Sequence, residues 1–457
     1  MAVNPWIVKH CFYPIHERLL GRSSLASLRQ LEKSQWLTPA ELHRLQQAKL
    51  RDLLTHANRH CPFYRQRLAD AQIVPELARV EDLIRLPLLT KADIRRYGPL
   101  FTWLDAPGGV HRYTTGGSTG EPLVFFFDRR RQAYDQAARV RSHRWFGADL
   151  GDREVYMWGS PLELNRQNRA RALRDRLTNH LLLSAFAMSP TRMDAYLESI
   201  QRYDPVSIFG YPSSLALLVS RARATGRTLH LPHLRAVFVT GETLMPADRA
   251  ELEDYFGVPV ANGYGSREGG FIAHECPHGR LHVTDENLII EIIDSRARPV
   301  APSELGRLVI THLDTYAMPF IRYLTGDLAR RAADQTLCPC GRGLSTIESV
   351  EGRQTDFLVA RDGTIRHALS AIYVLRECDR IERYRITQDA DLAVHVDVVC
   401  REPLADSLLQ HLHDGLAAAL GHDLSITINQ VENIRPAPSG KLRPVISHVQ
   451  PVAALTP

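Results

Sequence analysis

The chain has 457 residues, of which 44% are hydrophobic and 23% charged, and its formal net charge is +5. This length favours two or more domains, and the composition favours folded domains over disorder. The weak net charge argues against a nucleic-acid-binding protein, and no apolar run approaches the roughly 18 residues of a membrane span. Because the N-terminus also lacks the layout of a secretory signal, we expect a cytoplasmic protein.

The first 90 or so residues read as mostly helical. In "TPAELHRLQQAKLRDLLTHANRH", Thr38, Pro39 and Glu41 form a helix-start pattern, and apolar residues follow at spacings of three and four. The densest basic run, "RRRQ" at 129–132, is interpreted as a solvated face. The scattered cysteines are interpreted as small buried hydrophobic residues; they are Cys11, Cys61, Cys378 and Cys400.

Residues 100–330 alternate short apolar runs with helical patterns. The runs "EVYMWGS", "VSIFGYP", "AVFVTGE" and "PVANGYG" predict strands, and "SSLALLVSRARATG" predicts a helix between two of them. This alternation predicts an α/β fold, a large domain of helix-covered sheet whose ligands bind at loops after the strands.

The stretch "YTTGGSTGEP" (113–122) combines glycines with hydroxyl side chains. Glycines let backbone N–H groups approach a phosphate, but no Gly-Lys-Ser/Thr follows, so this is not a Walker A loop. A surface Gly/Ser linker is the alternative. The flanking runs "VHRYT" and "PLVFFF" favour a loop that joins the two strands of a hairpin.

After residue 350 the pattern predicts a small α+β domain over 353–457. A helix near 368–378, strands at "RYRITQ" and "LAVHVDVVC", a helix near 403–420 and a strand at "LSITINQV" follow a strand-rich junction. This βαββαβ order is the ferredoxin-like plan.

Four polar side chains stand out after predicted strands or turns. Tyr264 in "NGYGSREGG" offers a flat ring for a nucleobase, and Glu268 is a hard oxygen ligand that suits Mg²⁺. Asp327 in "YLTGD" follows a tight Thr-Gly turn and could hold both hydroxyls of a ribose, although a turn-capping role is the alternative. Lys441 in "PSGKLRP" is the only lysine after Lys91, and an ammonium there could bridge a carboxylate and a phosphate.

A cysteine and histidine group has metal-ligand spacing. "CPHGRLH" contributes Cys276 and His282, and "CPCGR" contributes Cys338 and Cys340. Four such ligands suffice for a closed, structural zinc site, and reduced thiols in a loop are the alternative. The neighbouring His274 and His278 are expected at the surface.

In order and spacing, these motifs resemble the adenylate-forming (ANL) superfamily. "TTGGSTGEP", "NGYGSREGG", "YLTGD", "GRQTD" and "PSGKLRP" are similar to its phosphate loop, its Tyr-Gly-x-Thr-Glu and Thr-Gly-Asp elements, its hinge and its catalytic lysine loop. "YPIHERLL", "HANRHCPFYRQRL", "LPLLTKADIR" and "FGYPSSLALL" are typical of the branch of phenylacetate–CoA ligases and CapK-like proteins. The resemblance covers nearly the whole chain. Some relatives in this branch carry a comparable zinc site.

The resemblance implies a role for each matching residue. The triphosphate would lie on Thr115, Gly116, Gly117, Ser118, Thr119 and Gly120. ATP or AMP would also contact Gly241, Glu242, Tyr264, Gly265, Ser266, Arg267, Asp327 and Arg353. Glu268 would bind Mg²⁺, Lys441 would be catalytic, and a small C-terminal domain would rotate about Thr355 and Asp356. The acid pocket would involve Trp158, Phe209, Tyr211 and Ala261.

The implied activity is ATP-dependent activation of a small carboxylic acid, with Mg²⁺, followed by acyl transfer to CoA. Arg267 stands where the family has Thr, Glu121 replaces a frequent Lys, and "ARDGTIRHALSAI" lacks the Gly-Val-Asn-Val-Phe-Pro stretch linked to CoA acceptance. An acyl-transfer enzyme of capsule polysaccharide synthesis, with an amine, sugar or carrier as acceptor, is therefore an alternative, and a nucleotide-binding scaffold is a second. The oligomeric state stays open, a homodimer included.

Overall fold

A computed structural model describes residues 3–114, 123–158, 169–185, 188–333, 337–353, 357–359, 361, 365–367, 369–376, 378, 380–434 and 444–449. Its N-terminal part is helical, as the sequence predicts. The capping box that begins α4 is present: Thr38 N donates to Glu41 Oε2 at 2.8 Å, and Glu41 N donates to Thr38 Oγ1 at 3.3 Å. The elements of this part are α1 Pro5–Ile7, η1 Val8–Phe12, α2 Tyr13–Leu19, α3 Ser24–Ser34, α4 Pro39–His60, α5 Pro62–Asp70, η2 Pro75–Leu77, η3 Val80–Arg85, α6 Lys91–Tyr97 and η4 Gly98–Phe101.

A hairpin follows, and its strands are those expected around the glycine-rich loop. β1 (Val110–Thr114) pairs antiparallel with β2 (Val124–Asp128), with Thr114 opposite Val124. The loop itself, from Thr115 to Gly120, lies outside the described residues. The two strands on either side of this loop pair as a hairpin, as the sequence predicts.

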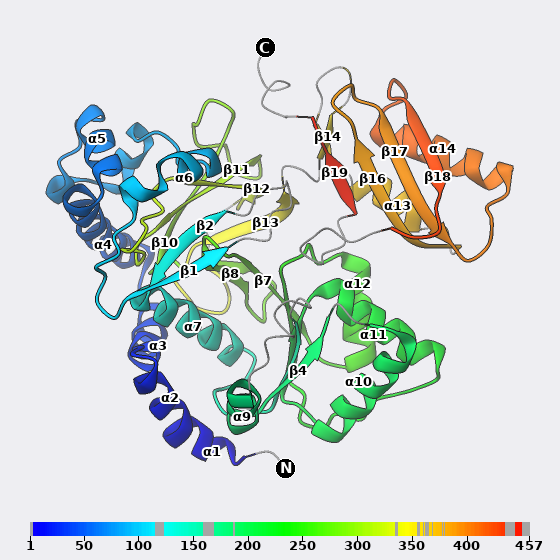
Figure 1. Cartoon of the computed structure of the whole chain (residues 1–457), viewed down its shortest axis with the longest axis horizontal. Helices are drawn as coiled ribbons and strands as arrows, with labels where there is room; N and C mark the ends of the chain where they lie inside the picture. Colours follow the sequence, from blue (N-terminus) through cyan, green and yellow to red (C-terminus); the bar gives the residue numbers. More distant parts are fainter. Residues whose placement is uncertain are drawn as a thin grey trace.

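Within the described residues, eleven strands form one mixed sheet in the order β10-β11-β12-β13-β9-β8-β7-β6-β5-β3-β4 (Figure 1). Its parallel part consists of β3 Glu154–Trp158, β4 His180–Ser184, β5 Ser207–Gly210, β6 Ala236–Thr240 and β7 Val260–Ser266. Its antiparallel part consists of β8 Gly270–Glu275, β9 Leu281–Val283, β10 Leu288–Ile293, β11 Leu305–His312, β12 Tyr323–Arg331 and β13 Thr346–Arg353.

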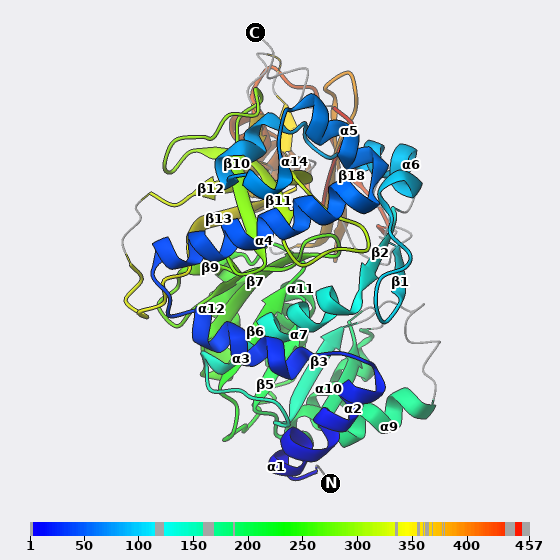
Figure 2. The ribbon, with the colours of Figure 1, turned by 90° about the vertical axis from the view of Figure 1, so that its left-hand side faces the viewer.

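Helices cover both faces of the parallel strands, as an α/β sheet requires. The helices are α7 Arg129–Arg144, α9 Arg169–Leu177, α10 Pro190–Tyr203, α11 Pro212–Ala224 and α12 Pro246–Phe256. Leucine, valine and methionine side chains of α10, α11 and α12 share one apolar core with β3, β5 and β6. α7 packs on the other face, where His143 stacks on Phe238 with ring centroids 3.7 Å apart. Figures 1 and 2 show α10 to α12 and α7 on opposite sides of these strands.

The C-terminal part forms a smaller α+β unit with its own apolar core. Its elements are β14 Phe357–Val359, β15 Ile365–His367, α13 Leu369–Arg376, β16 Ile381–Gln388, β17 Val394–Cys400, α14 Asp406–Leu420, β18 Ile426–Gln430 and β19 Val445–Ser447. The helices and strands follow the predicted order, and β17 shows the expected alternation of burial. Among the described residues, however, the first strand pairs only in the β14–β15 hairpin, and β19 takes the edge of the sheet β18-β17-β16-β19. No helix in the described part of the chain is both long and apolar enough to span a membrane.

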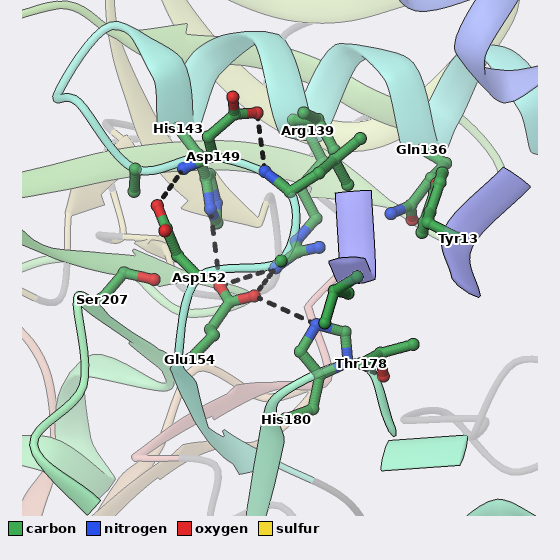
Figure 3. A pocket seen from close by; sticks show the side chains of 15 residues that line it. Tyr13, Gln136, Arg139, His143, Asp149, Asp152, Glu154, Thr178, His180 and Ser207 are labelled. Carbon is green, nitrogen blue, oxygen red and sulfur yellow. Dashed lines mark hydrogen bonds and ion pairs between the residues drawn. The ribbon is translucent and has the colours of Figure 1, made fainter. Parts of the chain in front are cut away.

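A buried ion pair joins α7 to the start of β3 (Figure 3). Arg139 Nη2 donates to both carboxylate oxygens of Glu154, at 2.6 and 2.5 Å, and His143 Nδ1 lies 3.4 Å from the same carboxylate. Burial alone would raise the pKa of Glu154, but the Arg139 guanidinium outweighs it and lowers the pKa to about 2. The charged Glu154 carboxylate of β3 therefore binds Arg139 and holds α7 in position against the sheet.

Glu154→Gln is expected to destabilise the protein by about 3–5 kcal/mol at pH 7, because Arg139 is left as an unpaired buried charge. The folded pKa lies below the ordinary value of 4.5, so the contribution of Glu154 is present above pH 4.5 and is lost as the pH falls toward 2. Urea midpoints of the two proteins should therefore converge as the pH falls through this range.

The control for this substitution is Glu198→Gln, because Glu198 pairs with Arg227 at 3.1 Å on an exposed surface. Loss of such a surface pair is expected to cost at most about 1 kcal/mol. Equal urea midpoints for the two variants at pH 7 would contradict the role assigned to Glu154.

Candidate functional site

Trp158, Tyr211 and Gly241, which the sequence analysis expects near the nucleotide and the acid, lie close together at the ends of β3, β5 and β6. The Tyr211 ring stacks on Trp158, with centroids 4.2 Å apart and planes 13° from parallel. Gly241 has φ +82°, and a Cβ at this position would lie 2.9 Å from the Tyr211 ring. Glycine is thus required here both for its backbone conformation and for the approach of Tyr211. Glu242 Oε2 accepts a hydrogen bond from Ser213 N at 3.2 Å, which ties this turn to the start of α11.

Tyr264 and Asp327 lie in contact, although 63 residues separate them in the chain. Tyr264 Oη donates to Asp327 Oδ2 at 2.6 Å. Burial, and then the neighbouring Asp327 carboxylate, raise the pKa of Tyr264 well above its ordinary value, so the phenol keeps its proton. The backbone of Arg353 on β13 pairs in register with that of Asp327 on β12. Arg353, the third residue expected in this group, therefore lies next to Asp327 in the sheet.

The surroundings of Asp327 differ from the sequence prediction in one respect. Asp327 does not follow a strand; it lies inside β12, directly after Gly326 with φ +85°. The register of β12 against β11 shifts across these residues, so a bulge replaces the predicted turn. Tyr264 and Gly265 lie inside β7, within the strand predicted from "PVANGYG", and Ser266 is the last residue of β7. A bulged strand therefore carries Asp327 where the sequence predicted a turn.

Glu268 lies in the turn between β7 and β8 and is 7% exposed. Tyr323 Oη donates to Glu268 Oε1 at 3.1 Å, and Arg131 Nη2 donates to the backbone carbonyl of Glu268 at 3.0 Å. Ser266 Oγ accepts from Gly269 N at 2.8 Å and closes the same turn, whereas the side chain of Arg267 is exposed. The turn thus holds one carboxylate firmly beside Tyr264, and such a carboxylate fits a hard divalent cation.

Arg131 was missed by the sequence interpretation, and the reading of "RRRQ" as a solvated face is wrong for this residue. Arg131 is fully buried, with hydrogen bonds to Asp135 at 2.8 Å and to Thr315 Oγ1 at 3.0 Å besides that to Glu268. The basic run begins a helix that packs on the sheet, so one arginine of the run points inward. The sequence signal that could have found it is Asp135, four residues later on the same helix face.

Several expected site residues lie outside the described residues. They are Thr115, Gly116, Gly117, Ser118, Thr119, Gly120, Thr355, Asp356 and Lys441. The backbone of Arg353 is described, and its side chain is not. The roles implied for these residues stay predictions.

A small pocket lies between α7 and the sheet. Phe209 and Ala261, which were expected in the acid pocket, line it, whereas Trp158 and Tyr211 pack beside Gly241 instead. The remaining lining residues were not foreseen; they are Ser142, His143, Phe238, Val239, Thr240, Asn262, Gly263, Phe271, His274 and Glu275. The expectation that His274 lies at the surface is wrong, because it is 7% exposed. His278 is exposed, as expected.

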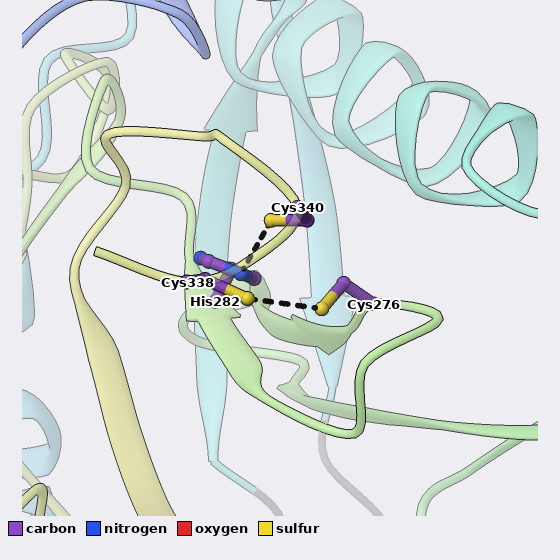
Figure 4. Close-up of side chains that lie close together, drawn as sticks. All are labelled: Cys276, His282, Cys338 and Cys340. Atoms are coloured by element: carbon purple, nitrogen blue, oxygen red, sulfur yellow. Dashed lines mark hydrogen bonds between the residues drawn. The ribbon is translucent and has the colours of Figure 1, made fainter. Parts of the chain in front are cut away.

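The cysteine and histidine group predicted as a zinc site is brought together (Figure 4). The ligand atoms of Cys276, His282, Cys338 and Cys340 all lie within 4.8 Å of one another. Cys276 Sγ is 3.6 Å from Cys338 Sγ, and Cys340 Sγ is 3.3 Å from His282 Nε2. A disulfide needs about 2.05 Å between sulfurs, whereas ligands of a tetrahedral zinc lie about 3.5–3.8 Å apart, so the spacing fits zinc.

The second ring nitrogen of His282 supports the same assignment. His282 Nδ1 lies 3.2 Å from the carbonyl oxygen of Leu344. A proton on Nδ1 leaves Nε2 as the free lone pair that faces Cys340, an arrangement common among metal-bound histidines.

Among the scattered cysteines that the sequence predicts as buried hydrophobic residues, Cys61 and Cys378 are buried and Cys400 is half-buried. Cys11 is exposed, so that prediction is wrong for Cys11, which lies on the outer side of η1.

Comparisons with known proteins agree with this geometry. The sequence model of the AMP-binding enzyme family matches residues 114–315, and that of the CapK C-terminal domain matches residues 358–448. Protein CapK of Staphylococcus aureus is 22% identical over 418 residues, which cover 90% of each chain. Phenylacetate-coenzyme A ligase of Thermus thermophilus is 26% identical over 439 residues, 89% of this chain and 96% of the relative. A solved structure of 2-hydroxyisobutyryl-CoA ligase in the postadenylation state superposes with TM-score 0.71 at 20% identity, over 93% of each chain.

Proposed function

The chain belongs to the adenylate-forming superfamily, in the branch of CapK and the phenylacetate–CoA ligases, and from this we propose that it activates a small carboxylic acid with ATP and transfers the acyl group to CoA. The observation that carries the proposal is the contact between Tyr264 and Asp327 beside the buried Glu268. A flat ring, a fixed carboxylate acceptor and a buried carboxylate that suits a divalent cation lie close together there.

Each residue would act through its ordinary chemistry. Asp327 would accept hydrogen bonds from the ribose hydroxyls, and the Tyr264 ring would stack on adenine beside Gly241 and Glu242. Glu268 would hold Mg²⁺, which neutralises phosphate charge when bound. Thr115 to Gly120 would bind the triphosphate, and Lys441 would bridge the attacking carboxylate and the α-phosphate.

The proposed reaction has two steps. A carboxylate oxygen of the acid attacks the α-phosphorus, the bond to the β-phosphate oxygen breaks, and pyrophosphate leaves. The thiol of CoA then attacks the acyl carbon, loses its proton and displaces AMP. Both reactants of the first step are anions, so the site must supply positive charge and hold them in line. Since ATP and CoA are metabolites of the cytoplasm, we place the protein there.

We also propose that the C-terminal domain begins at about residue 353 and rotates about Thr355 and Asp356 between the two steps. An amine, sugar or carrier acceptor in polysaccharide synthesis is the second candidate. The match of residues 358–448 to the CapK C-terminal domain and the absent Gly-Val-Asn-Val-Phe-Pro stretch favour it. We further propose one structural zinc per chain, held by Cys276, His282, Cys338 and Cys340.

ATP–pyrophosphate exchange across aryl, fatty and amino acids tests the adenylation. Exchange that depends on one class of acid is expected, and its complete absence across the panel would favour the nucleotide-binding scaffold. Acceptor assays with CoA, amines and amino sugars, run with the best acid, then separate the two acyl-transfer candidates.

Tyr264→Phe tests the proposed nucleotide position. The substitution keeps the ring and removes the hydroxyl that holds Asp327, so the KM for ATP is expected to rise about 5–10-fold with little change in kcat. Tyr255→Phe is the matched control, because Tyr255 Oη donates to the Arg227 carbonyl at 3.1 Å, away from the site. If both variants keep the wild-type KM for ATP, Asp327 does not hold the ribose through this contact.

A further inference from the structure

Arg131, in the first turn of α7, is fully buried, and its donor groups are directed at three different residues. Nε donates to Asp135 Oδ2 at 2.8 Å on the same helix, and Nη1 donates to Thr315 Oγ1 at 3.0 Å. Nη2 donates to the backbone carbonyl of Glu268 at 3.0 Å. Burial of an arginine is costly unless such partners are supplied. An apolar side chain would fill the same space without that cost, so these hydrogen bonds point to a role beyond packing.

The guanidinium also faces the strand that follows the glycine-rich stretch. Its Cζ lies over the Phe127 ring of β2, 4.4 Å from the ring centroid. Asp128, the last residue of β2, accepts hydrogen bonds from Arg131 N at 2.8 Å and from Tyr316 N at 2.7 Å. Arg131 therefore lies where three parts of the chain come together: the β1–β2 hairpin, the turn that carries Glu268, and the segment before β12.

The turn that carries Glu268 has a shape that fits the side chains of Arg131 and Asp135. Gly270 has φ +68°, and a Cβ at this position would overlap Asp135 Oδ1 and would lie 2.9 Å from Arg131 Nη2. Glycine leaves room for both side chains and adopts this backbone conformation without strain. The stretch "REGG" therefore allows the buried pair of α7 to approach the turn closely.

The hydrogen bond from Arg131 fixes the backbone of Glu268, and the backbone sets the direction of the carboxylate. A hydrogen bond from a charged donor is stronger than one between neutral groups, and burial shields this one from water. Tyr323 Oη donates to Glu268 Oε1 at 3.1 Å, so the backbone and the side chain of Glu268 are each held by a buried partner. The affinity of a protein for a metal depends on such outer contacts as well as on the ligand itself.

We propose that Arg131 is a positioning residue: it holds the Glu268 carboxylate at a fixed place relative to the β1–β2 hairpin, and the affinity for a nucleotide-bound divalent cation depends on this contact. The inference rests on the proposed function, in which Glu268 holds Mg²⁺ and the glycine-rich stretch binds the triphosphate. It adds a residue that acts only through Glu268, because a fully buried guanidinium has no surface for the nucleotide.

Nucleotide binding with and without the cation tests this role without turnover. The probe is α,β-methylene-ATP, which cannot release pyrophosphate, and its affinity for the full chain is measured by titration calorimetry in Mg²⁺ and in EDTA. Wild type is expected to bind the probe about 10–100-fold more tightly in Mg²⁺ than in EDTA. Arg131→Lys keeps the charge and loses the planar set of donors, so this gain should fall by about fivefold or more. The affinity of Arg131→Lys in EDTA should stay near the wild-type value.

Arg221→Lys is the matched control, because Arg221 also holds a carboxylate through two hydrogen bonds, to Asp194 at 3.0 and 2.7 Å. It lies near the other end of α11 from Tyr211 and should keep the wild-type gain. Asp135→Asn removes the charge that pairs with Arg131 while nearly keeping its shape, and it should lower the gain in the same direction. Melting curves show which variants are folded, and Asp135→Asn takes the place of Arg131→Lys if the latter is not.

The inference is overturned if the folded variant keeps the wild-type gain, whether its affinity falls equally in Mg²⁺ and in EDTA or does not fall at all. An equal fall in both conditions is the result that a merely structural role would give. Wild type that binds the probe equally well in Mg²⁺ and in EDTA also overturns the inference, and the nucleotide-binding role then stands without it. Wild type that binds the probe in neither condition overturns the proposed function, and the inference with it.

Discussion

Lys441→Ala is expected to lower the rate of acyl-adenylate formation by about 10²–10³-fold while leaving the fold intact. The acid and the α-phosphate are both anionic, and an ammonium between them offsets the charge that develops as they approach. Lys441 is the only lysine after Lys91, so no lysine near it in the sequence can replace it. ATP–pyrophosphate exchange with the best acid measures the effect.

Arg401→Ala is the control for this prediction. Arg401 lies in the same C-terminal part, its side chain is 73% exposed, and it pairs with Glu382 on the surface. The control removes one positive charge of the C-terminal part and should keep exchange near the wild-type rate. An exchange rate for Lys441→Ala equal to that of Arg401→Ala would refute the catalytic role.

Cys338→Ser is expected to abolish zinc binding and to destabilise the protein by about 4 kcal/mol or more, the range typical of a lost structural metal. Cys276 and Cys338 are 62 residues apart in the chain, and a shared metal would hold their two loops together. Metal analysis of protein purified without chelators should find one zinc per wild-type chain. Urea unfolding measures the loss of stability.

Cys11→Ser makes the same chemical change at an exposed free cysteine, so it should keep both the zinc and the urea midpoint. Zinc-free wild-type protein would contradict the proposed site. So would equal unfolding midpoints for Cys338→Ser and Cys11→Ser, because the thiol would then have no more than a local packing role.

The local structure of this protein could be predicted well because its signals are local. The Thr38 capping box, the strands "AVFVTGE" and "VSIFGYP", and the hairpin around the glycine-rich stretch depend on residues only a few positions apart. The four side chains of the cysteine and histidine group lie together as predicted, since their residue types and spacing restrict the chemistry. The errors at Arg131, Cys11 and His274 share one cause: the burial of a side chain depends on which distant element packs over it.

The amino-acid sequence is enough to indicate the kind of protein, because the order of five short motifs is typical of the adenylate-forming superfamily, and it predicts that Tyr264, Glu268 and Asp327 belong to one site. How these residues come into contact can be seen only in the folded protein. Tyr264 reaches Asp327 because β7 and a bulged β12 belong to the same sheet, and pairing between strands so far apart leaves no periodic signal in the chain. The same holds for the small pocket under α7, where the helix folds back over the sheet and buries a histidine that the sequence alone would leave in solvent.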